Sequence, residues 1–138
     1  MFLGYLTYKV NKETATCLGL SAVKLLKKDL DALMIALPSD LYIKDEESFR
    51  KQIEIGAIYA EKNKAIVTFG IEPTSPETGY GYIKLGEEVV KENSLFKVER
   101  FTEKPKEDTA KEFIRSKRYL WNSGIFVLRA DGLCTKVR

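Results

Sequence analysis

Four groups of polar residues could carry chemistry in this sequence, and apolar runs separate them. They are Asp40, the segment Thr78–Tyr82, the pair Glu103 and Lys104, and Asn122. A carboxylate can ligate a hard cation, glycines let backbone groups approach a ligand, and a lysine or an amide can hold a phosphate or a hydroxyl. The chain contains no histidine, which excludes histidine-based nucleophilic, acid–base and metal-binding chemistry. Any chemistry must therefore use carboxylates, lysines, backbone donors or a cation bound to oxygen.

Each of these groups also has a common structural explanation. A single carboxylate after a strand often caps a helix or forms a turn, a Glu-Lys pair is often solvated, and Trp-Asn-Ser-Gly often forms a turn. A functional interpretation therefore depends on whether the fold brings the groups together.

The segment Thr68–Ile83 organises the rest of the chain. It follows Ala65–Phe69, a short apolar and β-branched run that is typical of a buried parallel strand. Prolines and a glycine then stiffen a loop, and Tyr80-Gly81-Tyr82-Ile83 resumes an extended segment. Polar loops that leave buried strands bind small molecules in open α/β sheets. The alternative is a plain strand–turn–strand connection.

Composition indicates a globular protein and sets limits on its partners. Of 138 residues, 44% are hydrophobic and 31% are charged, and the net charge is +3 with both signs interspersed. We therefore expect no nucleic-acid binding and no attraction to an anionic membrane. No apolar run is long enough to span a bilayer, and the first residues lack the features of a signal peptide, so we expect a cytoplasmic location. Two cysteines make neither a disulfide framework nor a zinc site, and Cys17 is expected to be a small core residue.

Hydrophobic periodicity predicts a single α/β domain over residues 1–138. The expected elements are a strand at 2–10, a helix from Thr14 to about 28, a strand at 32–37, a helix from Asp45 to about 63, strands at 64–69, 80–85 and 95–102, a helix starting at Pro105, and a strand at 119–128. We expect a turn at Gly86 and a short polar end at 131–138.

This order predicts a mainly parallel sheet with helices on both faces. The uncharged run 32–37 is typical of a central strand, covered on both sides. Because the carboxyl ends of parallel strands share one rim, we expect the four polar groups to face one crevice.

Four segments resemble the mannose-1-phosphate guanylyltransferases (GDP-mannose pyrophosphorylases) in order and spacing. The long loop 68–83 is the most specific match, and the others are Leu37-Pro-Ser-Asp40, Phe101-Thr-Glu-Lys-Pro105 and Leu120-Trp-Asn-Ser-Gly-Ile-Phe126. The resemblance covers roughly residues 8–130. It implies a Rossmann-like nucleotide-diphospho-sugar transferase fold and the reaction of GTP with mannose 1-phosphate to give GDP-mannose and pyrophosphate. The reaction is an in-line displacement that relies on positioning and on charge cancellation, with Mg²⁺ as cofactor.

The resemblance also implies roles for individual residues. Asp40 would ligate Mg²⁺, Lys104 would hold the sugar phosphate, and Glu103 and Asn122 would bind sugar hydroxyls. The sugar pocket would be lined by Gly79, Tyr80, Gly81 and Tyr82, and the nucleotide would contact Thr14 and Ala15.

The sequence departs from the family pattern at several places. The family's opening glycine-rich loop, which grips the triphosphate, does not occur here, so the resemblance is to the middle of a longer enzyme that is truncated at both ends. Leu41 replaces a histidine after the aspartate, and Glu13 stands where the family has asparagine. A chain without that loop could bind a sugar phosphate or a nucleotide sugar without turnover, or it could be an inert remnant. It would also expose an unpaired sheet edge, which predicts self-association.

Overall fold

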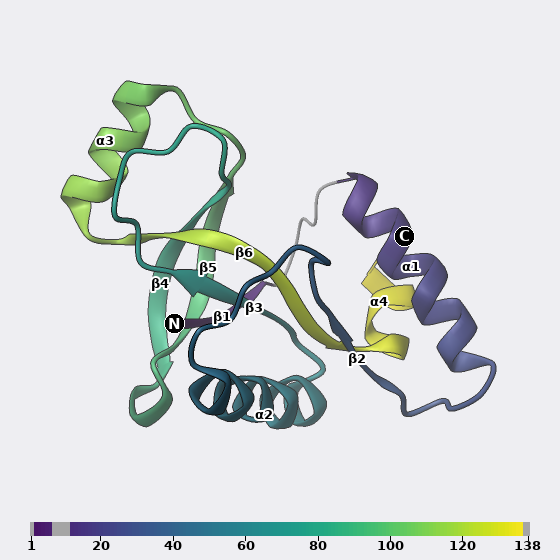
Figure 1. The fold of residues 1–138 in the computed structure, drawn as a ribbon. Coiled ribbons are helices and arrows are strands. Elements are labelled where there is room, and N and C mark those ends of the chain that lie inside the picture. The colour runs from purple at the N-terminus through teal and green to yellow at the C-terminus, as the bar shows by residue number, and fades with distance from the viewer. Residues whose placement is uncertain (1, 7–11, 137–138) are drawn as a thin grey trace. The chain divides into compact units, whose positions relative to one another are not determined.

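The computed structural model describes the backbone of residues 2–6 and 12–136 and the side chains of residues 15–133. The chain forms six strands, four α-helices and one short 3-10 helix in these ranges (Figure 1). The contacts divide it into two compact units. The first contains Met1–Tyr5 and Thr68–Gly124, and the second contains Leu6–Val67 and Ile125–Arg138. The single-domain organisation expected from the sequence stays a prediction.

The described strands follow the hydrogen-bonded order β2-β6-β3-β1-β5-β4, with an additional pairing of β6 with β4. Their bounds are β1 Phe2–Leu6, β2 Leu33–Ala36, β3 Ile66–Ile71, β4 Tyr82–Val90, β5 Leu95–Thr102 and β6 Tyr119–Arg129. The α/β fold class is confirmed, but the sheet is mixed. β1 pairs with β5 in parallel, whereas β2–β6, β4–β5 and β4–β6 are antiparallel. A helical turn of only Lys91–Asn93 joins β4 to β5, and so short a connection forces an antiparallel pair.

In the first unit, aromatic side chains attach helix α3 (Glu107–Ser116) to the strands. The ring of Phe113 stacks on Tyr119 of β6 with 3.8 Å between the ring centroids. It also lies 5.4 Å from the ring of Tyr82 on β4. Tyr82 is fully buried. These contacts fix the start of β4, which follows the long loop.

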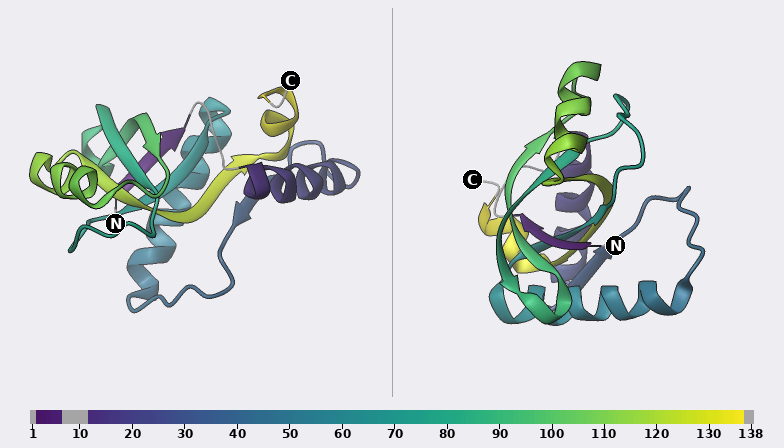
Figure 2. Two further views of the ribbon diagram at one scale, coloured as in Figure 1. Left: turned by 90° about the horizontal axis from the view of Figure 1, so that it is seen from above. Right: turned by 90° about the vertical axis from the view of Figure 1, so that its left-hand side faces the viewer.

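The second unit contains the helices α1 (Lys12–Leu26), α2 (Glu46–Asn63) and α4 (Ala130–Lys136). The predicted cap at Asp45 is confirmed, because its carboxylate accepts a 3.0 Å hydrogen bond from the backbone N–H of Ser48. Helices α1 and α4 lie side by side (Figures 1 and 2).

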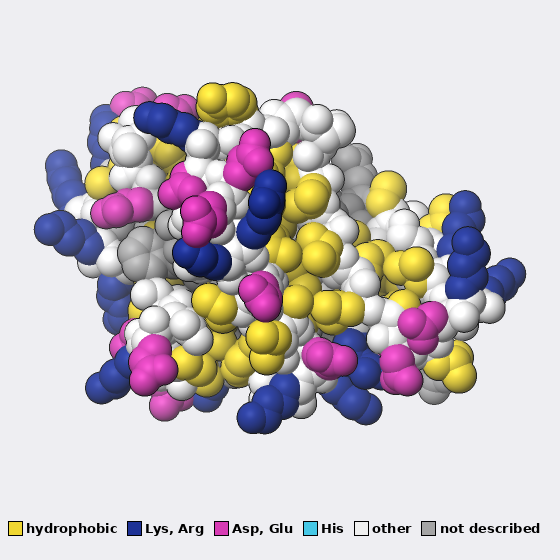
Figure 3. Space-filling model, turned by 60° about the horizontal axis from the view of Figure 1, so that its bottom comes forward, with side chains coloured by type: hydrophobic (Ala, Val, Ile, Leu, Met, Phe, Trp, Pro, Cys, Tyr) yellow, Lys and Arg dark blue, Asp and Glu magenta, His cyan; other side chains and the backbone are white. Residues whose placement is uncertain are grey.

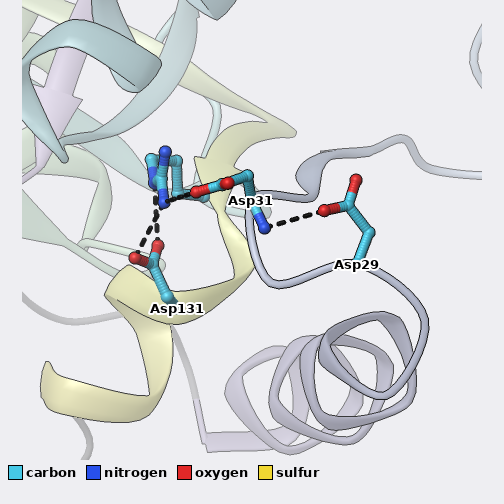
Figure 4. A network of polar contacts seen from close by, with 4 residues as sticks. Asp29, Asp31 and Asp131 are labelled. Atoms are coloured by element: carbon cyan, nitrogen blue, oxygen red, sulfur yellow. Dashed lines mark hydrogen bonds and ion pairs between the residues drawn. The ribbon is translucent and has the colours of Figure 1, made fainter.

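An ion-pair network fixes β2 against the end of β6 in the second unit. The Arg129 guanidinium donates to Asp31 at 2.8 Å and to Asp131 at 2.9 Å. Figure 4 shows both carboxylates directed to this guanidinium, and Asp29 accepting the backbone N–H of Asp31. Arg129 lowers the pKa of the Asp131 carboxyl below its ordinary value. The network therefore ties the turn before β2 to the first turn of α4.

The structure corrects two expectations about burial. Cys17 is exposed, because Leu18 and Ala22 form the buried face of α1 and Cys17 lies about 100° around the helix from Leu18. The strand at 32–37 is not central: β2 stands at the end of the described strand order, and the side chain of Ile35 is 45% exposed.

Three expectations about element boundaries are also corrected. The expected turn at Gly86 lies inside β4, where the strand bulges and the backbone carbonyl of Lys97 would be 3.0 Å from an added Cβ. The expected polar end contains the helix α4. Pro105 precedes Lys106, the N-cap of α3, rather than occupying the first helical position. The end of the expected first strand, residues 7–10, lies outside the described residues.

Candidate functional site

The first unit brings three of the expected site residues into contact. The start of β4 lies beside β6, so the backbone N–H of Asn122 donates a 2.8 Å hydrogen bond to the carbonyl of Gly81. A Cβ added at Gly81 would lie 3.0 Å from Oε2 of Glu103 and 2.7 Å from the ring of Phe101. Gly81 therefore leaves room for the Glu103 carboxylate, which is directed at the backbone of the loop.

The tyrosines on either side of Gly81 hold the loop in different ways. The exposed ring of Tyr80 contacts Trp121 edge to face, with 5.1 Å between the ring centroids. The buried Tyr82 donates its hydroxyl to the carbonyl of Glu77 at 2.9 Å. The indole N–H of Trp121 is buried without a partner among the described residues. Tyr80 thus holds the loop against β6, and Tyr82 ties β4 back to the loop at Glu77.

Asn122 does not lie in a turn, as a Trp-Asn-Ser-Gly segment suggests, but inside β6. Its side-chain Oδ1 accepts a 3.1 Å hydrogen bond from the hydroxyl of Thr68 on β3. Asn122 is therefore held by its backbone on one side and by its side chain on the other. Thr68 was not singled out from the sequence; the only signal is a hydroxyl within an otherwise apolar strand.

Lys104 has an unusual backbone conformation. Its φ of 41° lies in the left-handed region, although it is not glycine and it precedes Pro105. The other described non-glycine residues with positive φ are Lys64, Ser94 and Lys117, and each is the C-cap of a helix. Lys104 has no such structural reason. Backbone strain of this kind concentrates at functional sites, where it orients a side chain.

The remaining expected site residues stand elsewhere. Gly79 is exposed in the long loop, and a Cβ added there would meet nothing within 4 Å. Asp40 occupies the exposed turn after β2, and Ala15 lies in α1; both belong to the second unit. The side chain of Thr14 lies outside the described residues. The meeting of Asp40 with Lys104 at one rim therefore stays a prediction.

The magnesium ion expected from the sequence stays a prediction. No three Asp, Glu, Cys or His side chains in the described part of the chain gather into a metal site of their own. Mg²⁺ usually takes one or two carboxylates and completes its shell with phosphate oxygens and water. A single exposed carboxylate such as Asp40 is compatible with that donor set.

No helix in the described ranges is long and apolar enough to cross a membrane.

Several known proteins are similar to this chain in sequence and in fold. Residues 3–136 match the family described as nucleotidyl transferase. The mannose-1-phosphate guanylyltransferase of Salmonella montevideo is 48% identical over 126 residues, which are 88% of this chain and 26% of that protein. The xanthan biosynthesis protein XanB of Xanthomonas campestris pv. campestris (strain B100) is 42% identical over 127 residues, 92% of this chain and 26% of that protein.

A solved structure agrees with these sequence matches. The crystal structure described as mannose-1-phosphate geranyltransferase from Thermus thermophilus superposes with a TM-score of 0.76 at 34% identity. The superposition covers 88% of this chain and 34% of the Thermus thermophilus chain. The chain thus spans about a quarter of the length of the curated relatives that it matches.

Proposed function

We propose, from the premise that the chain belongs to the nucleotidyl transferase family, that it supplies the sugar-phosphate half of a mannose-1-phosphate guanylyltransferase. The reaction joins GTP and mannose 1-phosphate to give GDP-mannose and pyrophosphate. One observation carries the proposal: Gly81, Glu103 and Asn122 meet within a single unit, beside the strained Lys104. A phosphorylated sugar needs partners for its hydroxyls and for its phosphate. The backbone at Gly81, the Glu103 carboxylate and the Asn122 amide suit the hydroxyls, and the Lys104 cation suits the phosphate.

The chemistry needs no covalent intermediate with the protein. An oxygen of the sugar phosphate attacks the α-phosphorus of the nucleotide, the bond to the β-phosphate oxygen breaks, and pyrophosphate leaves with the electron pair. The nucleophile is already anionic, so a chain without histidine can support the reaction. Catalysis then comes from holding the two phosphates in line and from offsetting their charge.

Each residue of the site has a role in this proposal. Lys104 holds the sugar phosphate as a compact charge, and Glu103 accepts hydrogen bonds from sugar hydroxyls. The Asn122 amide donates to a hydroxyl, while the backbone around Gly81 lines the pocket. Asp40 would hold Mg²⁺, which offsets phosphate charge when it is bound, and Thr14 and Ala15 would contact the nucleotide.

The test compares two neighbouring lysines by titration calorimetry with mannose 1-phosphate. We expect Lys104→Ala to weaken binding by about tenfold or more, because a hydrogen-bonded charge pair is lost, and Lys106→Ala to stay within about twofold. Lys106 is the matched control, since it is exposed two residues away at the N-cap of α3. Failure of the unmodified chain to bind mannose 1-phosphate, or equal losses in both variants, would contradict the proposal.

Binding without turnover is the second candidate, and the meeting of Gly81, Glu103 and Asn122 within the first unit supports it. An assay of pyrophosphate release from GTP and mannose 1-phosphate with Mg²⁺ separates the two. Release that depends on Lys104 supports the transferase. Binding with no release identifies this chain as a sugar-phosphate binding module.

We also propose that copies of the chain associate through β2. This strand is uncharged and stands at the end of the described strand order. The side chain of Ile35 in β2 is 45% exposed, and that of Leu37, directly after β2, is 52% exposed. A charge on such an edge blocks pairing with another strand. Sedimentation velocity over a range of concentrations should therefore show self-association that Ile35→Lys abolishes and that Ile58→Lys, at an exposed position on α2, leaves intact. A monomer at all concentrations would refute this. The cytoplasmic location expected from the sequence stays a prediction.

A further inference from the structure

Thr68 is the one buried polar side chain in the described core, and its burial needs an explanation. It lies in β3 between Val67 and Phe69, and none of the three has exposed surface. A hydroxyl that is removed from water is unfavourable unless it forms a hydrogen bond. An apolar β-branched residue would fill the same space in the strand without that cost. A hydroxyl at this position therefore indicates a specific partner.

One partner of the hydroxyl is the side chain of Asn122. The Thr68 hydroxyl donates to Oδ1 of Asn122 at 3.1 Å, and the backbone N–H of Asn122 donates to the Gly81 carbonyl at 2.8 Å. An Asn amide has an acceptor oxygen on one side and an NH₂ donor on the other. With Oδ1 turned toward Thr68, the NH₂ group is turned away from it.

A glycine on β3 allows this contact to form. A Cβ added at Gly70 would lie 2.8 Å from the Cβ of Leu120 on β6, so the two strands approach more closely than two side chains would permit. Gly70 lies two residues after Thr68, and Leu120 lies two residues before Asn122. All four residues therefore share one face of the β3–β6 pair, and the close approach brings the hydroxyl within reach of the amide.

We propose that Thr68 is a positioning residue that fixes the orientation of the Asn122 amide, so that its NH₂ group donates to a hydroxyl oxygen of the sugar. This inference rests on the proposed function for the identity of the ligand. Thr68 does not contact the sugar itself. It selects which side of the amide the ligand meets, and the opposite orientation would present an acceptor.

The first test is a double-mutant cycle with mannose 1-phosphate as the probe. Thr68→Val keeps the shape and removes the hydroxyl, while Thr68→Ser keeps the hydroxyl. We expect Thr68→Val to weaken binding by about tenfold and Thr68→Ser to stay within about twofold, since one orienting hydrogen bond is lost only in the first. In the Asn122→Ala background, Thr68→Val should have no further effect. Equal losses in both backgrounds, or none in either, would overturn the inference.

The second test needs no ligand and so separates this inference from the proposed function. The side-chain amide resonances of Asn122 in the NMR spectrum should shift in Thr68→Val and stay close to their original positions in Thr68→Ser. If the unmodified chain does not bind mannose 1-phosphate, the proposed function fails, and these resonances still decide whether Thr68 orients the amide. Unchanged resonances in Thr68→Val would overturn it.

A further variant covers the case in which Thr68→Val does not fold. Thr68→Cys has a similar size and a thiol that is only a weak donor. It should weaken binding by several-fold relative to Thr68→Ser and should shift the Asn122 resonances. A Thr68→Cys chain that matches Thr68→Ser in both measurements would contradict the role of the hydroxyl.

Discussion

The two halves of β6 have different surroundings. In the first unit, Asn122 is bonded to β3 through its side chain and to the residue before β4 through its backbone. In the second unit, the half at Phe126–Arg129 pairs with β2, beyond which the described strand order ends. The first half joins polar groups into a site, whereas beside the second half apolar side chains reach the surface. Figure 3 shows one face of the molecule with its hydrophobic side chains in yellow.

The difference teaches that the contacts of the proposed sugar site and the apolar surface are separate properties of the chain. The large hydrophobic residues that are exposed are concentrated in the second unit: Leu20, Val23, Leu30, Ile35, Leu37, Tyr42 and Ile58. In the first unit they are Ile71, Tyr80 and Val89. We therefore expect substitutions in the first unit to affect ligand binding and those along β2 to affect association.

The largest expected effect is on the free energy of unfolding, and a comparison of two isoleucines measures it. Ile83 on β4 is 1% exposed and Ile35 on β2 is 45% exposed. Ile83→Ala should lower the free energy of unfolding by about 2–5 kcal/mol, because it removes buried methylenes and leaves a cavity, whereas Ile35→Ala should cost less than about 1 kcal/mol. Urea denaturation at low protein concentration measures both. Equal costs would mean that Ile35 is as well packed as Ile83, which would contradict the contrast between the two strands.

The next effect compares two glycines in the long loop. In Gly81→Ala the new methyl group meets the Phe101 ring and Glu103, whereas in Gly79→Ala it meets nothing within 4 Å. Gly81→Ala should therefore weaken mannose 1-phosphate binding by about tenfold or more. The overpacked methyl group costs about 1–3 kcal/mol and displaces the Glu103 carboxylate. Gly79→Ala should bind normally. Titration calorimetry measures the binding of both variants. Normal binding by Gly81→Ala would show that Glu103 does not belong to the site.

A smaller effect compares two lysines with positive φ. Lys104 lies in the site, whereas Lys117 caps the end of α3. Glycine relieves left-handed strain, so each Lys→Gly change should raise the free energy of unfolding by about 1 kcal/mol. Only Lys104→Gly should also lose mannose 1-phosphate binding. Thermal denaturation and calorimetry report the two properties, and a destabilised Lys104→Gly chain would show that the strain was not there to be relieved.

The elements were largely predictable where the pattern was local. The run at 95–102 alternates clearly and forms β5, and Asp45 caps α2 as its position indicates. Helix α4 was missed because Asp131 and Gly132 favour a turn, and only the packing against α1 supports a helix there. The edge position of β2 was missed for another reason. An uncharged apolar run does not reveal how many strands flank it.

The candidate site was predictable as a set of residue types but not as a geometry. Gly81, Glu103 and Asn122 were identified, yet their contacts depend on the antiparallel pairing of β4 with both β5 and β6, which the sequence order did not indicate. Asn122 lies in a strand because hydrogen bonds to β3 and to Gly81 outweigh its turn preference. Thr68 was missed because a threonine within an apolar strand resembles an ordinary β-branched residue.

The smallest expected effect is the pH dependence of the second unit's ion-pair network. Arg129 lowers the pKa of Asp131 in the folded chain, so the folded state binds this proton less readily than the unfolded state does. The stabilisation is therefore complete above the unfolded pKa of about 4 and is lost as the pH falls through the lower folded value. Because Asp131 is partly exposed, its share should be about 1 kcal/mol or less.

Urea denaturation between pH 7 and pH 3 should show a smaller loss of stability on acidification in Asp131→Asn than in the unmodified chain. Glu61→Gln, at an exposed position on α2, is the control and should leave the acid profile nearly unchanged. If Asp131→Asn and the unmodified chain lose stability in parallel, the network does not hold β2 to α4.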